Sequence, residues 1–157
     1  MKIAIAGKGG AGKTTIATLL IDSFARAGYQ VYAVDADPNQ HLASYLNFPG
    51  SSEITPLMEM KELIEERVGR TRDGFAPFFK ANPDVSDLTA KYALEEENIR
   101  LMAVGGVGAG GSGCACPENS FFKSLLHEII TGRTEVVIAD MEAGLEHLQR
   151  GTTEFID

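Results

Sequence analysis

The sequence predicts an α/β fold in which a mostly parallel β-sheet is flanked by helices. The apolar stretch Lys2–Ala6 predicts a buried strand, and it runs directly into a glycine cluster. Residues Lys13–Ala27 carry apolar side chains at helical spacing, and Gly28 stands where a glycine commonly ends a helix. A second apolar strand follows over Gln30–Asp35. This order of strand, glycine-rich turn, helix and strand is a βαβ unit, which requires parallel strands and a right-handed crossover.

The rest of the chain is expected to extend this sheet and cover its faces. Two further apolar strands are predicted, together with two longer helices, one short helix and a loop. The stretch Gly69–Asp87 mixes its signals and contains the helix breakers Pro77 and Pro83, so it receives no assignment. The predicted elements are a short helix over His41–Leu46, a loop over Asn47–Thr55, helices over Leu57–Val68 and Glu118–Thr131, and strands over Ile99–Val104 and Val136–Asp140.

Length and composition narrow the possible functions. The chain has 157 residues, which suits one domain, and a formal net charge of −8 without a basic tract, which argues against nucleic-acid binding. No stretch approaches the ~20 apolar residues of a membrane span, so no membrane association is expected. The two cysteines, Cys114 and Cys116, are too close in sequence for an easy disulfide, which favours reduced thiols and a cytoplasmic location.

The glycine cluster after the first strand fits the phosphate-binding pattern G-x-x-x-x-G-K-[ST], the P-loop of nucleoside triphosphatases. Glycines let backbone N–H groups face phosphate oxygens, Lys13 would reach the β- and γ-phosphates, and the Thr14 hydroxyl would bind Mg²⁺. The same glycines also spell G-x-G-x-x-G, and a dinucleotide site with Asp35 on the ribose is the alternative. The predicted phosphate-binding residues are Gly7, Lys8, Gly9, Gly10, Ala11, Gly12, Lys13, Thr14 and Thr15.

Three aspartates follow predicted strands, at the sheet edge that also carries the phosphate loop. Asp140 comes after four apolar residues and matches a Walker B aspartate, which would hold a Mg²⁺-bound water. Asp35 would either cap its turn or act near Mg²⁺, and Asp37 precedes a stiffening proline. Gly144 completes the pattern D-x-x-x-G, in which a backbone N–H would contact the γ-phosphate.

Lys8 is not required by a standard P-loop. The segment G-K-G-G-A-G-K-T-T resembles the signature of the deviant Walker A ATPases, the superfamily of MinD, the nitrogenase iron protein and the arsenite-pump ATPases. This resemblance implies that Lys8 crosses the interface of a homodimer to the partner's nucleotide. It also implies that Asp37, in an Asp-Pro switch segment, orients the attacking water and senses the γ-phosphate.

Cys114 and Cys116 stand in a glycine-rich loop before a predicted helix. They are either free thiols, made reactive by the helix N-terminus, or metal ligands. A closed thiolate site needs about four ligands, and two chains related by a two-fold axis would supply them.

Residues 104–119 and 140–151 resemble the CooC-type accessory ATPases that insert nickel into carbon monoxide dehydrogenase, and their acetyl-CoA synthase relatives. The resemblance covers residues 1–46 and 99–153. It implies Ni²⁺ or Zn²⁺ at Cys114 and Cys116, and ATP hydrolysis coupled to nickel delivery to one of these two client enzymes. The alternatives are a MinD-like switch without metal and an iron–sulfur carrier, although no cysteine follows Asp140 to bridge a cluster.

The number of predicted strands before residue 157 is smaller than this fold class normally has. Doubly wound sheets usually have about five or more strands, and the family pattern continues further. We therefore expect residues 1–157 to be the N-terminal part of a single P-loop ATPase domain, without its last strands and adenine-contacting segment. The apolar strand Val136–Ala139 would lie inside the complete sheet, and loss of the strands beyond it would expose an apolar edge and face.

Overall fold

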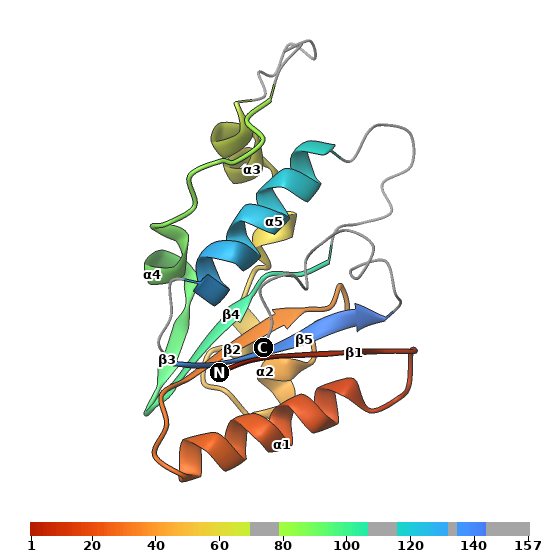
Figure 1. Ribbon diagram of the computed structural model, residues 1–157, viewed down its shortest axis with the longest axis vertical. Helices are drawn as coiled ribbons and strands as arrows, with labels where there is room; N and C mark the ends of the chain where they lie inside the picture. The colour runs from red at the N-terminus through yellow and green to blue at the C-terminus, as the bar shows by residue number, and fades with distance from the viewer. Residues whose placement is uncertain (70–78, 107–115, 132–134, 144–157) are drawn as a thin grey trace.

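A computed structural model describes residues 1–69, 79–106, 116–131 and 135–143. Its centre is a five-stranded sheet in the order β1-β5-β2-β4-β3, in which only β3 runs antiparallel to its neighbour. The predicted mostly parallel α/β fold is confirmed (Figure 1). The strands are β1 (Lys2–Gly7), β2 (Val31–Ala36), β3 (Leu94–Glu96), β4 (Ile99–Ala103) and β5 (Val136–Ala143).

Helices α1 (Lys13–Arg26) and α2 (Leu42–Tyr45) cover one face of the sheet (Figure 1). Ala17 and Ile21 of α1 are fully buried there, because their helical spacing turns both toward the strands. Gly28 has a φ of 85°, directly after the Ala27 C-cap, and so ends α1 as predicted. The buried strand residues of this face alternate along each strand and are Val31, Ala33, Leu101, Val136 and Ile138.

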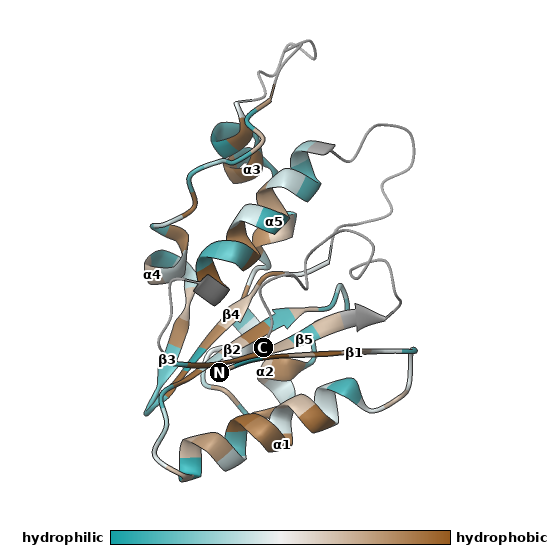
Figure 2. Cartoon of the chain, in the orientation of Figure 1, coloured by the Kyte–Doolittle hydropathy of each residue, from teal (hydrophilic) through white to brown (hydrophobic). Residues whose placement is uncertain are grey.

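The opposite face is covered by α3 (Lys61–Val68), α4 (Leu88–Tyr92) and α5 (Cys116–Thr131), as Figure 1 shows. This second core is the larger one, and Figure 2 shows the apolar residues that run through the sheet between the two helical layers. Because strand residues alternate between faces, the second set consists of the neighbours of the first. It includes Tyr32, Val34, Met102, Val137, Ala139 and Met141 on the strands, and Phe121, Phe122, Leu125, Leu126 and Ile129 on α5.

The helix predicted over Leu57–Val68 is wrong in its first part. A 3₁₀ turn (Leu57–Glu59) stands there, and Met60 has a non-helical ψ of 73° before α3 begins. The backbone N–H of Met58 donates to the carbonyl oxygen of Val104 at 2.9 Å, which ties this turn to the end of β4. A tertiary hydrogen bond has therefore overridden local helical propensity.

Several further features differ from the sequence prediction. A second 3₁₀ turn (Ser51–Glu53) lies within the predicted loop, and neither α4 nor β3 was predicted. Helix α5 begins at Cys116, inside the stretch predicted to be loop. The last strand, β5, lies inside the sheet as predicted, but it borders no exposed edge, because it pairs with β1 on one side and β2 on the other. The outer strands of the described sheet are β1 and β3.

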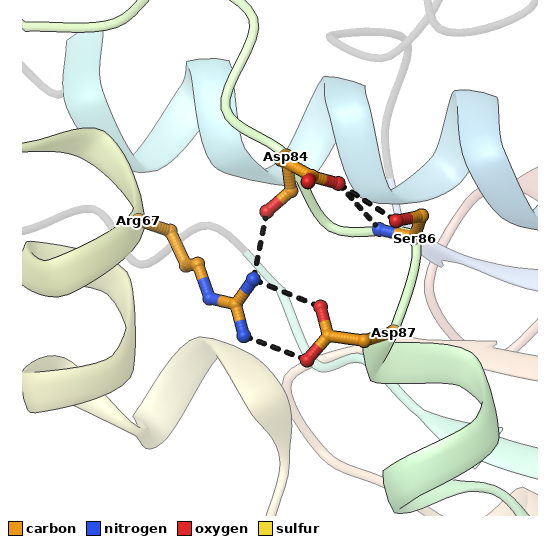
Figure 3. A network of polar contacts seen from close by, with 4 residues as sticks. All are labelled: Arg67, Asp84, Ser86 and Asp87. Carbon is orange, nitrogen blue, oxygen red and sulfur yellow. Dashed lines mark hydrogen bonds and ion pairs between the residues drawn. The ribbon is translucent and has the colours of Figure 1, made fainter.

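An ionic network fastens α3 to the segment before α4 (Figure 3). The Arg67 guanidinium donates to both carboxylate oxygens of Asp87, at 2.8 and 2.7 Å, and to the carbonyl oxygen of Asp84 at 3.2 Å. Asp84 in turn accepts the backbone N–H and the hydroxyl of Ser86. Among the described residues, no helix has the length and apolarity needed to span a bilayer.

Candidate functional site

The turn between β1 and α1 has the backbone of a phosphate-binding loop. Gly10 and Gly12 have φ values of 75° and 85°, a region that favours glycine. The loop is closed by a hydrogen bond from the Ala11 N–H to the Lys8 carbonyl oxygen at 3.2 Å. Lys13 opens α1 and is only 9% exposed, whereas Lys8 is exposed. The two lysines therefore occupy different environments, one held within the loop and one available on its surface.

Asp140 and Thr14 are brought together from opposite ends of the described chain. The Thr14 hydroxyl donates to Asp140 Oδ2 at 2.6 Å. Asp140 is 1% exposed, and its Oδ1 is buried with no hydrogen-bond partner. A buried carboxylate oxygen without a partner is costly, and a Mg²⁺-bound water would satisfy it. The Thr14 hydroxyl and the Asp140 carboxylate place oxygen atoms next to each other, and Mg²⁺ binds to oxygen ligands. These two side chains therefore fit a Mg²⁺ site.

The electrostatics of Asp140 agree with this assignment. Burial raises the pKa of its carboxyl, and the nearby charge of Asp37 raises it further. The hydrogen bond from Thr14 and the positive charges of Lys13 and His41 lower that pKa in part. A bound cation would supply the missing stabilisation of the carboxylate.

Asp35 stands beside Asp140, because the parallel register of β2 and β5 pairs these two residues. Its Oδ1 accepts the backbone N–H of Asp37 at 3.2 Å, and its Oδ2 accepts that of Leu42 at 3.0 Å. Asp35 thus has the turn-capping role that is one of its two predicted roles, and a role near Mg²⁺ stays a prediction. Burial is the main cause that raises the pKa of Asp35 to about 6, with smaller contributions from the charges of Asp140 and Asp37.

Asp37 lies in the turn after β2 and is half-buried. Its Oδ1 accepts the backbone N–H of Asn39 at 2.8 Å, which fixes the carboxylate relative to the turn. Since its charge raises the pKa of both Asp35 and Asp140, all three carboxylates share one edge of the sheet. Its predicted action on the attacking water stays a prediction.

The described residues include only part of the predicted metal site. Cys114 and Gly144 lie outside the described residues, and Cys116 is described only as the first residue of α5. Within the described ranges, no three His, Cys, Asp or Glu side chains gather closely enough to hold a metal ion by themselves. Nickel or zinc at Cys114 and Cys116 therefore stays a prediction.

The residues that surround the Asp37 turn were not predicted from the sequence. Gly105 and Gly106 follow β4 and were assigned only to the cysteine loop, yet they lie against Pro38 and Gln40. His41 lies close enough to Asp140 to lower the pKa of that carboxyl electrostatically. No sequence motif signals these contacts, because they join segments more than 60 residues apart.

The sequence of the chain matches a known family of nucleotide-binding domains. Residues 2–153 match the model of the CobQ/CobB/MinD/ParA nucleotide binding domain. The chain belongs to this family. A MinD/ParA-type nucleotide-binding domain accounts for the lysine and the threonine that the alternative dinucleotide site leaves unused.

Individual relatives within this family are similar to the chain over its whole length. The chain is 46% identical over 157 residues to an uncharacterised ATP-binding protein of Methanocaldococcus jannaschii. It is 42% identical over 159 residues to the carbon monoxide dehydrogenase accessory protein CooC of Rhodospirillum rubrum. Each match covers 100% of this chain and 60% of the relative. The chain thus spans about 60% of the length of these MinD/ParA-type relatives.

A solved structure supports the fold independently of sequence. A plasmid partition protein of Borrelia burgdorferi matches with a TM-score of 0.57 at 15% identity, over 99% of this chain and 61% of that one. At this identity the likeness concerns architecture alone.

Proposed function

We propose that this domain binds and hydrolyses Mg-ATP, and that it acts in a homodimer that delivers nickel to carbon monoxide dehydrogenase or acetyl-CoA synthase. The observation that carries the ATPase part is the Thr14–Asp140 pair, with its unpartnered Asp140 Oδ1 beside the phosphate loop. The 42% identity to a carbon monoxide dehydrogenase accessory protein, together with Cys114 and Cys116, supports the nickel part.

Each residue has a distinct task in this proposal. The N–H groups at the start of α1 and the Lys13 ammonium bind the phosphates, because both present positive charge to an anion. Thr14 and Asp140 would hold Mg²⁺, which when bound offsets charge on the β- and γ-phosphates. Asp37 orients the water that attacks the γ-phosphate.

The dimer is proposed from Lys8. Its side chain is exposed beside the phosphate loop, where it can reach a nucleotide on a second subunit. The cysteine pairs of two subunits would together supply four thiolates for the transported ion. Nucleotide binding would change metal release only if it favours one dimer state over the other.

A lysine substitution tests the ATPase part. Lys13→Ala should weaken binding of Mg-ATP by about 10- to 100-fold, because hydrogen bonds to charged groups contribute about 1.5–3 kcal/mol. Lys123→Ala, which removes an exposed lysine from α5, is the matched control and should bind normally. Isothermal titration would measure both. Equal affinity in the two variants would contradict the phosphate-binding role.

Metal analysis tests the nickel part. We expect one Ni²⁺ or Zn²⁺ per dimer, lost in both Cys114→Ser and Cys116→Ser, and loss of ATP-dependent dimerisation in Lys8→Ala. One metal per monomer would contradict a shared site. A protein that hydrolyses ATP but binds no metal would instead be a MinD-like switch, and a brown chromophore after anaerobic reconstitution would indicate an iron–sulfur carrier.

A further inference from the structure

A cavity of about 360 Å³ lies on the face of the sheet that α4 and α5 cover. Its floor is a row of three residues on neighbouring strands, because the register pairs Glu95 with Arg100 and Arg100 with Tyr32. Helix α4 contributes Thr89 to the walls and α5 contributes Glu128 (Figure 1). The volume lies within the range of small-molecule sites.

This cavity is separate from the proposed nucleotide site. Tyr32 is the second residue of β2 and Asp35 is the fifth, so the two lie about 10 Å apart along the strand. Tyr32 and Thr89 are 1% and 5% exposed, whereas Ser86 and Ala90 are exposed at the rim. The cavity thus has a buried floor and an open rim through which a small molecule can enter.

The charges around the cavity do not balance. The Arg100 guanidinium forms an ion pair with Glu95 at 2.8 Å, and its Nη1 lies 3.6 Å from Oε1 of Glu135. Glu128 is half-buried and forms no ion pair with the residues that the structure describes. Since two carboxylates already compensate Arg100, the remaining carboxylate makes the cavity negative. A negative concave site favours a cationic ligand over an anionic one.

The lining favours an organic cation over a metal ion. Within the described ranges, no three His, Cys, Asp or Glu side chains could hold a metal ion together. An ammonium group instead needs hydrogen-bond acceptors, which carboxylate and hydroxyl oxygens supply. The Ser86 hydroxyl donates to Asp84 Oδ1 at 2.8 Å, so its oxygen can still accept an N–H donor. Tyr32 and Ala90 add apolar surface for a hydrocarbon chain.

We infer that this cavity binds a small aliphatic amine, with its ammonium group on Glu128 and its hydrocarbon chain against Tyr32 and Ala90. A charge-assisted hydrogen bond to the Glu128 carboxylate supplies most of the affinity. The hydroxyl groups of Ser86 and Thr89 offer further acceptors. The site shares no residue with the phosphate-binding edge, so it forms whether or not the domain hydrolyses ATP.

Putrescine, a linear aliphatic diamine, is the probe, and isothermal titration of the nucleotide-free protein measures its binding. Two compounds with the same chain length serve as ligand controls: 1,4-butanediol is uncharged, and succinate carries the opposite charge. Putrescine should bind about 10-fold or more tightly than either control, because it alone brings a positive charge to Glu128. Its affinity should fall as the salt concentration rises.

Two variants change the charge and the shape of the cavity separately. Glu128→Gln keeps the length of the side chain and removes its charge, so the affinity for putrescine should fall about 10-fold or more. Ala90→Leu keeps every charge and places a larger side chain at the rim, so it should weaken binding by a similar factor. Ala90 is exposed and leucine is a good helix former, so this variant should still fold.

Glu96→Gln is the matched control for the loss of charge. Glu96 follows Glu95 on β3 and points to the opposite face of the sheet, because neighbouring strand residues alternate. The affinity for putrescine should therefore stay within about twofold of the wild type. Thermal unfolding of each variant distinguishes loss of the site from loss of the fold.

Several outcomes would overturn the inference. These are a wild type that does not bind putrescine, equal binding of 1,4-butanediol, and unchanged affinity in either Glu128→Gln or Ala90→Leu. An equal loss in Glu96→Gln would attribute binding to the overall negative charge of the protein instead of the cavity. Preferential binding of succinate would show that Arg100 selects an anion and would reverse the inferred charge of the ligand.

Discussion

Two groups of carboxylates in this molecule have opposite electrostatic environments. At the carboxyl edge of the sheet, burial raises the pKa of both Asp35 and Asp140. In the network between α3 and α4, the hydrogen bond from Arg67 lowers the pKa of Asp87, and that from the Ser86 hydroxyl lowers the pKa of Asp84. The first group lacks a direct cation partner in the described contacts, whereas the second includes one.

This difference in environment distinguishes carboxylates that fit a ligand site from carboxylates that form a structural ion pair. Asp87 is about half exposed and has both oxygens bonded to one guanidinium, so its charge is already compensated. Asp140 is almost fully buried and keeps Oδ1 without a hydrogen bond. A folded protein retains such a costly group where a ligand completes it, which is why perturbed carboxyls gather at functional sites.

The largest expected effect concerns Asp35 and pH. Its pKa is about 6 in the folded protein and 3.8 in the unfolded chain, a gap of about 3 kcal/mol. Because the folded state holds this proton more tightly, nucleotide-free protein should lose stability as pH rises from about 4 to about 6, and then level off. Denaturant unfolding of wild type and Asp35→Asn across this range measures the difference. Equal pH dependence in the two proteins would remove the contrast between the two carboxylate groups.

The next effect concerns Asp140 and Mg²⁺. Asp140→Asn keeps an oxygen that can accept the Thr14 hydroxyl but removes the charge. The apparent affinity for Mg²⁺ in the presence of nucleotide should fall by about 10- to 100-fold, since interactions with a charged group contribute about 1.5–3 kcal/mol. Mg²⁺ titrations of nucleotide binding provide the measurement. Binding that is insensitive to this substitution would mean that the unpartnered oxygen serves no cation.

The smallest effect is expected at Arg67. Arg67→Lys loses the two-pronged contact with Asp87, so the melting temperature should fall slightly. Nucleotide affinity should stay within about twofold of wild type, because α3 is not part of the phosphate-binding edge and distant sites act independently. Asp87→Asn should give the same pattern. A large loss of nucleotide affinity in either variant would show that the two groups are coupled.

The sequence was most informative where chemistry depends on local order. The phosphate loop and Thr14 follow a fixed local pattern of strand, glycine, lysine and hydroxyl residue, and Asp140 was recognised separately as the acidic residue that follows an apolar strand. The carboxyl ends of parallel strands meet at one edge of the sheet, and the Thr14 hydroxyl is hydrogen-bonded to Asp140 there. Periodicity likewise located four of the strands and helices α1, α2 and α5. The family and the mostly parallel sheet followed from these elements.

The missed features depend on contacts between distant segments. The break at Met60 comes with the bond between Met58 and Val104, and the short β3 gains its strand character by pairing with β4. Gly106 was assigned only to the glycine-rich loop, because no residue near it in the sequence indicates its contact with Pro38. Such tertiary effects override local propensity and leave no local pattern to read.

The place of β5 in the sheet has a consequence for how the chain folds. The partner of β1 in the described sheet is β5, and the register joins Lys2 to Val137. During synthesis at about 5–20 residues per second, β1 waits roughly 7–27 s for that partner to emerge from the ribosome. Until β5 is synthesised, the apolar side of α1 is covered only by the strands that precede β5 in the chain. A nascent chain of this topology is a natural substrate for chaperones that shield apolar surface, and its refolding should be slow for its length because its contacts are so far apart in sequence.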